Sequence, residues 1–433
     1  MFSVTIGLIG IGIMLLLMAF RMPIAIALAL PGFVGALVIM GPQAAFTGLG
    51  TIPFSHCHSY TLTTIPMFIL MGQLIFVAGI SSDIFNTFDK WLRQLRGGLA
   101  MATIGACGIF AAACGSSLAS SATMGSVALP EMEELKYDRK LALGTIAAGG
   151  TLGILIPPST AFIVYGLLSE QSIGKLFIAG IVPGILLALL FMLTINVQSR
   201  FRQDIAPSAA AITWKQRFIS LKGLWVVFIL FIVVIGGIYI GVFTPTEAAG
   251  VGAFGAFIIA VFRKRLTWQG LLDSLTSTLH TTCMIFAIII GAMIFNYFLA
   301  VTGLPMHLAD FVMSLSVPKI GILCVILMVY LILGMFMDAM AMVIITIPIF
   351  LPAIQSMGFD LIWSGVVLVI VIEMAMITPP VGMNVYVLSG VAKHVPLEEI
   401  FQGVLIFVVP MLILMILLLV FPELALFLPN MMK

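Results

Sequence analysis

Apolar runs of about 18–20 residues recur along nearly all of the 433-residue sequence. As a helix, a run of this length crosses the roughly 30 Å hydrocarbon core of a bilayer. The chain is 62% hydrophobic and only 8% charged, which excludes an ordinary soluble domain. The sequence also lacks the alternating apolar and polar residues of a membrane β-barrel. These features predict an all-α protein that crosses the membrane many times.

The predicted spans are apolar throughout and are separated by short polar segments. They cover 2–20, 22–41, 62–79, 141–168, 176–199, 224–242, 245–262, 277–300, 361–392 and 398–420. Two further apolar regions, 98–129 and 319–354, are longer than one span and are interrupted near the middle by polar or flexible residues. The first run has neither a basic start nor a small-residue cleavage site, so we expect a retained helix.

The nineteen Lys and Arg residues predict which side of the membrane each loop faces. With Met1 outside, alternation of the spans places sixteen of them inside and leaves only Lys175, Lys319 and Lys433 outside. This asymmetry fits the positive-inside rule if 98–129 and 319–354 each enter and leave on one side. We therefore interpret both regions as re-entrant helical hairpins with tips near the middle of the membrane.

The two halves of the chain are related by a shift of 222 positions. The shift aligns LPEMEELKYD (129–138) with LPAIQSMGFD (351–360), and Pro157-Pro158 with Pro379-Pro380. An odd number of crossings separates the halves, so the repeats have opposite orientations. Inverted repeats with helices broken inside the membrane are typical of secondary transporters.

The segment CGSSLASSATMGS (114–126) places many hydroxyl groups at the tip of the first predicted hairpin. A break in a membrane helix leaves backbone groups that must face protein, water or a bound ion. Carbonyl and hydroxyl oxygens suit an alkali cation, by the logic that applies to other hard cations. We expect a sodium ion between this tip and a second break, GGTLGILIPPS (149–159). The alternative is that the small residues only permit close helix packing.

Three carboxylates fall clearly within apolar spans. Asp338, at the tip of the second hairpin, is expected either to bind a cation or to cap the returning helix. Glu373 either functions directly or makes a buried interhelical hydrogen bond. Glu247 follows Thr244-Pro245-Thr246, a pattern that predicts a helix start with a capping role for Glu247.

No Lys or Arg lies in the middle of a predicted span, so an anionic substrate would need bound cations and helix N-termini for charge balance. Cation and substrate binding would then depend on one another. A proton-coupled carrier that uses Asp338 and Glu373 is the main alternative. The two predicted hairpins close on a site in the middle of the membrane, which favours an occluded site and disfavours the open pore of a channel. Only Asp338 could serve an intramembrane aspartyl protease, which needs two aspartates, so we expect no enzymatic activity.

Other polar residues indicate no further site. The triplet His56-Cys57-His58 lies in a predicted outer loop without further ligands, so we expect no metal site there. The five cysteines form no spaced pair and are expected to serve as packing residues. The net charge of +2 is too small to suggest a nucleic-acid partner.

Five segments together resemble the DctM-like large membrane subunit of tripartite ATP-independent periplasmic (TRAP) transporters. They are GSSLASSATMGSVALPEM (115–132), GTLGILIPPS (150–159), FTPTEAAGVGA (243–253), GMFMDAMAMVIITIPIFLP (334–352) and ITPPVGMNVYVLSG (377–390). The resemblance spans essentially the whole chain. It implies a sodium-coupled importer of an organic acid anion, located in the bacterial inner membrane and working by an elevator motion.

The resemblance also implies the binding residues. The first sodium site would use Ser116, Ser117, Gly153 and Pro157, and the second Asp338, Thr378, Pro379 and Gly382. The substrate would lie between the hairpin tips, near Ser120, Ser159 and Asn384.

The implied partners are a soluble periplasmic substrate-binding protein and a small four-helix membrane subunit. Because the chain begins with the first helix expected of the large subunit, we expect the small subunit to be a separate chain and the N-terminus to be periplasmic. Na+ would be co-transported. C4-dicarboxylates, sialic acids, other sugar acids, 2-oxo acids and sulfonates all stay open as substrates.

The chain is accordingly expected to divide into a scaffold, two arms and a mobile transport domain. The scaffold would comprise 1–80 and 223–300, the amphipathic arm helices 81–97 and 303–316, the transport repeats 98–199 and 317–433, and a cytoplasmic linker 200–222.

Overall fold

The structure is a computed structural model that describes residues 2–202, 205–207, 212–314 and 316–432. All the regular secondary structure of these residues is helical, which confirms the predicted all-α class. The helices that precede the first hairpin are α1 (Phe2–Ala19), α2 (Ile24–Met40), α3 (Pro42–Cys57), the 3-10 helix η1 (Tyr60–Thr63), α4 (Thr64–Val77) and α5 (Ile80–Leu92).

The first predicted hairpin consists of two helices that pack against each other, α6 (Gly98–Cys114) and α7 (Ser117–Glu134). Gly115 ends α6 with a φ of 62°, in the left-handed region that glycine adopts without strain. The broken helix follows as α8 (Arg139–Leu155) and α9 (Thr160–Ser169), with Pro157-Pro158 in the break, and then α10 (Ile173–Phe201). The hairpin and the break were both predicted, and both are confirmed.

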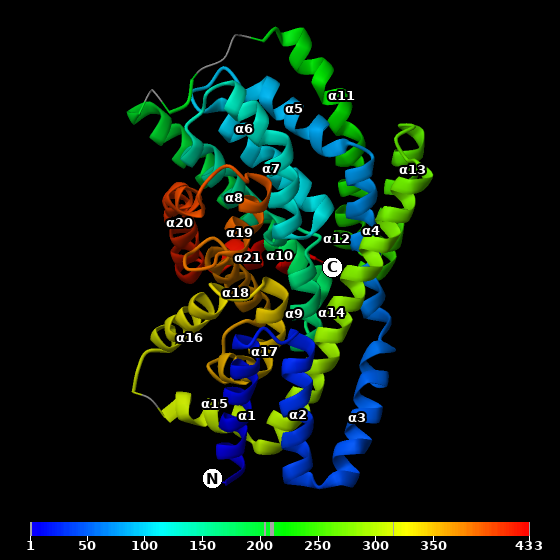
Figure 1. Cartoon of the computed structure of the whole chain (residues 1–433), viewed down its shortest axis with the longest axis vertical. Helices are drawn as coiled ribbons and strands as arrows, with labels where there is room; N and C mark the ends of the chain where they lie inside the picture. Colours follow the sequence, from blue (N-terminus) through cyan, green and yellow to red (C-terminus); the bar gives the residue numbers. More distant parts are fainter. Residues whose placement is uncertain (1, 203–204, 208–211, 315, 433) are drawn as a thin grey trace.

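The second half repeats this pattern. Its helices are α16 (Lys319–Gly334), α17 (Ala339–Ser356), α18 (Leu361–Ala375), α19 (Met383–Val391), α20 (Leu397–Val420) and α21 (Glu423–Asn430). The second helices of the two hairpins, α7 and α17, each contain 18 residues and begin 222 positions apart. The first hairpin lies in the upper half of Figure 1 and the second in the lower half, as an inverted repeat requires.

The helices between the repeats are α11 (Trp214–Phe231), the π-helix η2 (Ile232–Gly236), α12 (Gly237–Tyr239), α13 (Pro245–Phe262), α14 (Trp268–Thr302) and α15 (Leu304–Ser314). At 35 residues, α14 is about 52 Å long and runs beside α2 and α4 (Figure 1). α2, α4 and α14 therefore form a tall support along one side of the two hairpins.

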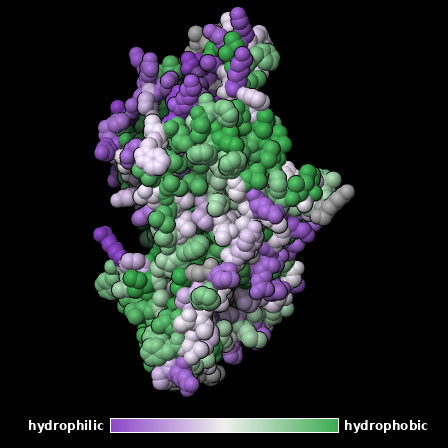
Figure 2. Space-filling view, turned by 90° about the vertical axis from the view of Figure 1, so that its right-hand side faces the viewer, coloured by the Kyte–Doolittle hydropathy of each residue, from purple (hydrophilic) through white to green (hydrophobic). Residues whose placement is uncertain are grey.

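By length and composition, eight helical segments of the described chain could cross a membrane. Figure 2 shows hydrophobic residues over much of one face, with hydrophilic residues at the upper end and over part of the lower half. Large apolar side chains are exposed on the surface of the molecule, including Trp225 and Phe228 at 60% each. Apolar area of this extent requires lipid or a partner protein as its surroundings.

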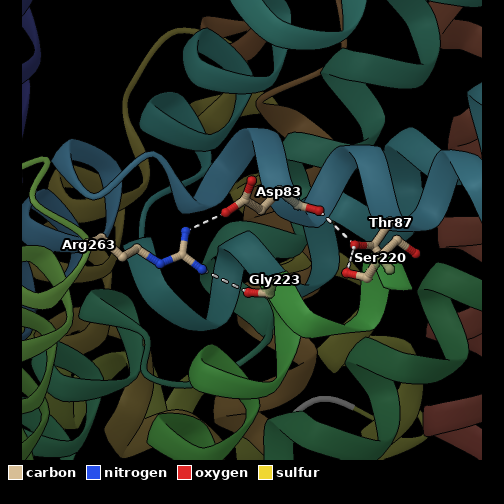
Figure 3. Close-up of polar contacts among 5 residues, drawn as sticks. All are labelled: Asp83, Thr87, Ser220, Gly223 and Arg263. Carbon is tan, nitrogen blue, oxygen red and sulfur yellow. Dashed lines mark hydrogen bonds and ion pairs between the residues drawn. The ribbon is translucent and has the colours of Figure 1, made fainter. Parts of the chain in front are cut away.

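The first amphipathic helix is tied to the end of α13 and to α11 by polar contacts (Figure 3). The Arg263 guanidinium forms an ion pair with Asp83 of α5 and donates to the Gly223 carbonyl oxygen of α11 at 3.1 Å. Thr87 Oγ1 of α5 lies 2.9 Å from the Ser220 carbonyl oxygen of α11. These bonds connect α5 to the helices between the repeats, and α5 also packs against α6 of the hairpin that follows it.

Two segments differ from the sequence-based expectation. The predicted outer loop before residue 60 is mostly the helix α3, because Pro42 starts a helix readily and Ala and Phe continue it. The predicted linker 200–222 is helical at both ends, since α10 extends to Phe201 and α11 begins at Trp214. A capping box between Thr213 and Gln216 starts α11.

Helices α8 and α20 touch backbone to backbone. A Cβ atom at Gly144 would lie 2.2 Å from the Gly403 carbonyl oxygen, and one at Gly403 would lie 2.0 Å from the Lys140 carbonyl oxygen. Contacts this short leave no room for any side chain at either position. Small residues at this crossing therefore join α20 of the second repeat to the first half of the molecule.

Candidate functional site

The tip of the first hairpin packs directly into the break after α8. Ser116 caps α7, where its side chain accepts a hydrogen bond from the Ala119 backbone N–H at 3.4 Å. A Cβ atom at Gly153 of α8 would lie 2.7 Å from the Ser116 carbonyl oxygen and 2.8 Å from Ser120 Oγ. The glycine thus lets these two oxygens approach α8 closely. Two of the residues predicted for the first sodium site, Ser116 and Gly153, are brought together here.

Backbone oxygens from both sides line this junction. The Gly115 carbonyl oxygen accepts a hydrogen bond from Thr160 Oγ1 at 2.9 Å, and a Cβ atom at Gly115 would lie 2.7 Å from the Pro158 carbonyl oxygen. The adjacent Pro157 is buried and precedes Pro158 through a cis peptide bond. Sequence reasoning missed Gly115 and Thr160, although the glycine at the helix end was a readable signal for a tight turn.

Ser117 contacts both halves of the molecule. Its hydroxyl group lies 3.8 Å from the sulfur of Met376, in the break of the second half. Its side chain is fully buried. Ser117 therefore links the first hairpin to the second broken helix, while its carbonyl oxygen faces Gly150 of α8.

At the tip of the second hairpin, Asp338 occupies the position equivalent to Ser116. One of its carboxyl oxygens accepts hydrogen bonds from the backbone N–H groups of Met340 at 2.9 Å and Ala341 at 3.2 Å. The capping role, one of the two predicted for Asp338, is confirmed. An N-cap leaves the second carboxyl oxygen available for another ligand.

The second break faces its hairpin through Gly382, which starts α19 with a φ of 53°. Its backbone N–H donates to the Met335 carbonyl oxygen at 3.4 Å. A Cβ atom at Gly382 would lie 3.2 Å from the Thr378 carbonyl oxygen, and the Thr378 hydroxyl donates to the Met374 carbonyl oxygen at 2.6 Å. Thr378, Pro379 and Gly382 therefore lie in one turn beside the second hairpin, and Met335 was not predicted.

The predicted substrate residues Ser120, Ser159 and Asn384 are all fully buried. Ser159 caps α9 by accepting a hydrogen bond from the Phe162 N–H at 3.3 Å. The Ser120 hydroxyl and both polar atoms of the Asn384 side chain have no hydrogen-bond partner among the described residues. Polar atoms that are buried without partners cost free energy, so a bound polar ligand would stabilise them.

Four half-helices begin around these junctions. α7 and α9 start where the first hairpin meets its break, and α17 and α19 start where the second does. α7 also packs against α19, and α9 against α17, so the two junctions cross-connect. Helix N-termini carry partial positive charge, and the exposed carbonyl groups beside them carry partial negative charge. Such an arrangement can hold cations and an anion close together.

A large cavity lies elsewhere and is almost entirely apolar. It encloses about 660 Å³ between α6 and α10 on one side and α4, α11 and η2 on the other. Phe88, Gly108, Ile185 and Trp225 are among its lining residues. This lining offers nothing to an ion or an organic anion, so the cavity is not the candidate site.

The remaining polar residues singled out in the sequence have structural roles or fall outside the description. Glu247 accepts hydrogen bonds from the Thr244 N–H at 2.8 Å and the Thr244 hydroxyl at 2.9 Å, which confirms its capping role. The side chains of His56 and Cys57 lie outside the described residues. Three or more His, Cys, Asp or Glu side chains do not converge anywhere in the described part of the chain.

Outside the membrane-spanning helices, Tyr137 anchors the turn between α7 and α8. Its hydroxyl group accepts a hydrogen bond from the Leu99 N–H at 3.3 Å, and burial raises its pKa. Close by, the Asp89 carboxylate raises the pKa of Arg93 through a hydrogen bond of 2.8 Å. The first contact joins the start of α6 to the turn that follows α7, and the second lies at the end of α5.

The chain matches a known protein family over residues 11–424, the "Tripartite ATP-independent periplasmic transporter, DctM component". It is 36% identical over 403 residues to the C4-dicarboxylate TRAP transporter large permease protein of Pseudomonas aeruginosa, covering 92% of this chain and 93% of that one. It is 34% identical to the sialic acid TRAP transporter large permease protein of Vibrio cholerae, covering 86% and 87%.

A third relative is the 2,3-diketo-L-gulonate TRAP transporter large permease protein of Escherichia coli, 33% identical with 96% and 97% coverage. Among solved structures, the Alcanivorax borkumensis YdaH transporter superposes with a TM-score of 0.65 over 91% of this chain and 89% of that one. At 14% identity this last similarity concerns the fold alone.

Proposed function

Because this chain belongs to the DctM family of tripartite ATP-independent periplasmic transporter components, we propose that it imports an organic acid anion together with sodium ions. The ions would bind where each hairpin tip meets its helix break, and the anion would bind between the two tips. The observation that carries this proposal is the pairing of each break with a hairpin, with oxygen atoms buried at both junctions. Membrane helices break in this way around bound ions.

The first proposed ion lies among Ser116, Ser117, Gly153 and Pro157. Support comes from the carbonyl oxygen of Ser116, which Gly153 allows to approach α8. The Ser117 contribution would come from its backbone, because its hydroxyl faces Met376. The second ion is proposed at Asp338, Thr378, Pro379 and Gly382, where the free oxygen of Asp338 supplies negative charge.

The anion is proposed to contact Ser120, Ser159 and Asn384. The names of the relatives include C4-dicarboxylates, sialic acid and 2,3-diketo-L-gulonate, which all carry carboxylate or acidic groups. Such a group would be balanced by the two cations and by the helix N-termini. The substrate and the sodium ions would therefore stabilise each other's binding.

We further propose an elevator motion, in which α6–α10 and α16–α21 form a transport unit that moves against a scaffold of α1–α4 and α11–α14. The apolar cavity between α11 and α6 supports this division, because the two parts are loosely packed there. The partners would be a small membrane subunit and a soluble periplasmic binding protein. The N-terminus is proposed to face the periplasm, which places most basic turns on the cytoplasmic side.

The test is uptake by proteoliposomes that contain this chain with its small subunit, supplied with the binding protein and a labelled substrate. We expect uptake with an inward sodium gradient and none when choline replaces sodium outside. Equal uptake in choline would contradict sodium coupling. Uptake without the binding protein would contradict its proposed role.

A further inference from the structure

The apolar cavity between α11 and the first hairpin extends over about one leaflet of a bilayer. Phe88 and Leu221 line one end, where α5 meets α11. Ala113 and Pro158 line the other end, beside the tip of the hairpin. Along α11 and η2 the lining runs from Leu221 to Val234, which is about 20 Å at the rise of a helix. Half of the hydrocarbon core of a membrane is about 15 Å thick, so the cavity has the depth of one layer of acyl chains.

The cavity is open to the outer surface of the molecule. Ile185, Leu189, Trp225 and Phe228 belong to its lining, and each is more than half exposed. Apart from the indole N–H of Trp225, the lining side chains of the described residues carry no polar group. Apolar space without an occupant loses dispersion contacts along its walls. Hydrocarbon from the surrounding bilayer can enter this cavity and would stabilise it.

A buried guanidinium group lies just beyond the α5 end of the cavity. Arg217 precedes Leu221 by one turn on the same face of α11 and is only 9% exposed. Its guanidinium carbon lies 4.9 Å from the centre of the Trp214 ring, so the side chain extends towards the start of α11. Among the described residues, the Nε atom of Arg217 has no hydrogen-bond acceptor and its guanidinium group forms no ion pair. Within this part of the chain, the buried cation therefore lacks a counter-charge.

The helix against which α11 packs supplies no free carboxylate. The two acidic residues of α5 are Asp83, which is paired with Arg263, and Asp89, which is paired with Arg93. A buried charge without a partner is strongly unfavourable, and hydrogen bonds between ionised groups are among the strongest in proteins. An anion from outside the chain would therefore stabilise Arg217.

Two tryptophans indicate that Arg217 lies at the depth of lipid headgroups. The ring centres of Trp91 in α5 and Trp214 in α11 lie 6.5 Å apart, and the Trp91 indole N–H donates to the Arg217 carbonyl oxygen at 3.3 Å. Tryptophan is enriched at the boundary between hydrocarbon and water in membrane proteins. A positive charge at headgroup depth is thus followed by apolar space at acyl-chain depth. A phospholipid has its charge and its hydrocarbon in the same order.

We propose that an anionic phospholipid from the surrounding bilayer binds here, with its phosphate group at Arg217 and an acyl chain in the cavity. The guanidinium N–H groups donate to the phosphate oxygens. A zwitterionic lipid binds less tightly, because its own ammonium group opposes the neutralisation of Arg217. A membrane helix of a partner fits less well, because such a helix crosses both leaflets and the cavity ends at the hairpin tip. The end of the acyl chain contacts Ala113 and Pro158, beside the first candidate ion site.

Lipid binding is measured without transport, by native mass spectrometry of the full chain released from detergent micelles. Phosphatidylglycerol, phosphatidylethanolamine and diacylglycerol with the same acyl chains are added to separate samples. We expect one retained phosphatidylglycerol per chain and weaker retention of the other two lipids. Absence of retained phosphatidylglycerol, or equal retention of either other lipid, would overturn the proposal.

The headgroup position is tested by Arg217→Gln. We expect this variant to lower the affinity for phosphatidylglycerol by about tenfold or more, because a buried charge pair loses one partner. Lys215→Gln is the matched control, since Lys215 is an exposed cation on another face of the same helix, and it should keep the wild-type affinity. Wild-type affinity in Arg217→Gln would overturn the assignment of the phosphate to Arg217.

The position of the acyl chain is tested by Gly108→Leu. This variant adds a side chain to the wall of the cavity, and we expect it to lower the affinity for phosphatidylglycerol several-fold. Gly50→Leu, on α3, should keep the wild-type affinity. Wild-type affinity in Gly108→Leu would show that the lipid binds elsewhere and would overturn the proposal. This variant decides the question even if Arg217→Gln does not fold, and elution from a sizing column monitors the fold of every variant.

Two further samples distinguish the phospholipid from other occupants. Glycerol phosphate, which has a phosphate group but no acyl chain, is expected not to displace the lipid, and displacement would indicate a site for free phosphate instead. The complex with the small membrane subunit is expected to retain the lipid, and its loss there would show that the subunit covers the cavity. Either of these contrary results would overturn the proposal. None of the measurements depends on sodium-driven uptake, so failure of the proposed transport function would leave them valid.

Discussion

Individual glycines determine how closely the hairpin tips approach the broken helices. Gly153 is the clearest case, because the atoms that a Cβ would meet are a carbonyl oxygen and a hydroxyl of the hairpin tip. A backbone oxygen cannot turn away as the end of a long side chain can. The glycine is therefore needed for the geometry of the first candidate ion site.

Replacing Gly153 with Ala is expected to push the first hairpin away from α8. Overpacking of this kind costs about 1–3 kcal/mol, so we expect the sodium affinity to fall by about tenfold or more. The measurement is the sodium dependence of uptake. Gly250→Ala is the matched control, because Gly250 is also helical and a Cβ there meets nothing within 4 Å. Equal sodium dependence in both variants would contradict this account.

Asp338→Asn is expected to weaken sodium binding while preserving the helix cap. The amide oxygen can still accept the Met340 and Ala341 N–H groups, but the negative charge is lost. We expect the sodium concentration for half-maximal uptake to rise by about tenfold.

The control for this variant is Asp360→Asn. Asp360 caps α18 in the same way, because it accepts hydrogen bonds from the Ile362 and Trp363 N–H groups at 2.8 and 2.9 Å. It lies at the end of α18 that is farthest from the second break. We expect its sodium dependence to stay at the wild-type level. If both aspartates affected sodium equally, helix capping rather than ion binding would explain Asp338.

Helix caps at the candidate site were more predictable than the directions of the other side chains. The caps at Ser116, Ser159 and Asp338 follow from small polar residues placed directly before helical segments. The Ser117 hydroxyl turns towards Met376 because helix packing across the two halves decides which face of α7 is covered. Packing between repeats leaves no local signal in a sequence.

At the scale of the elements, α5 connects the proposed transport unit to the proposed scaffold. It is joined to the first hairpin by a short turn, and it is held against α11 and α13 by Arg263 and Thr87 (Figure 3). The ion pair with Asp83 is partly exposed to solvent, so its contribution to stability is modest. A contact of modest strength can keep α5 in place and can still break when α5 moves.

Arg263→Ala is expected to loosen α5 without unfolding the protein. The lost ion pair and hydrogen bond are worth about 1 kcal/mol, so backbone hydrogen exchange in α5 should accelerate by about fivefold. Exchange is measured by mass spectrometry on the protein in nanodiscs. Lys264→Ala, at the exposed next residue, is expected to leave α5 unchanged. Unaltered exchange in Arg263→Ala would show that other contacts hold the arm.

The element order was largely predictable because charge placement constrains the topology. The two hairpins follow from the basic turns, and the shift of 222 positions places α7 and α17 at equivalent residues. Helix α3 was missed because two glycines and Pro53 reduce its helical signal. The full length of α14 was missed because its polar first turns extend beyond the apolar run.

At the scale of the whole molecule, the apolar cavity separates the proposed transport unit from the scaffold. Its walls come from both parts, so movement of one against the other would change its shape. Gly108 lies in the wall formed by α6, where a Cβ would meet only Ile156 and Leu152 at 3.5 and 3.7 Å. A larger side chain can therefore enter the cavity without first disturbing the resting structure.

Gly108→Leu is expected to fill part of the cavity and to slow uptake several-fold while the protein still folds and binds sodium. Gly50→Leu is the control, because a Cβ at Gly50 of α3 meets nothing within 4 Å. The measurements are the uptake rate and the sodium dependence of that rate. A normal rate in Gly108→Leu would show that the cavity keeps its shape throughout the transport cycle.

The second helices of the two hairpins, α7 and α17, are equal in length and lie in opposite directions. This arrangement has a consequence for the effects of mutations in this protein. Under the proposed mechanism the two copies move together in one transport unit, and each copy is directed towards the opposite side of the bilayer from its counterpart. Matching substitutions in these two helices should therefore not be equivalent. One would leave the carrier resting open to the cell interior, and the other would leave it resting open to the outside.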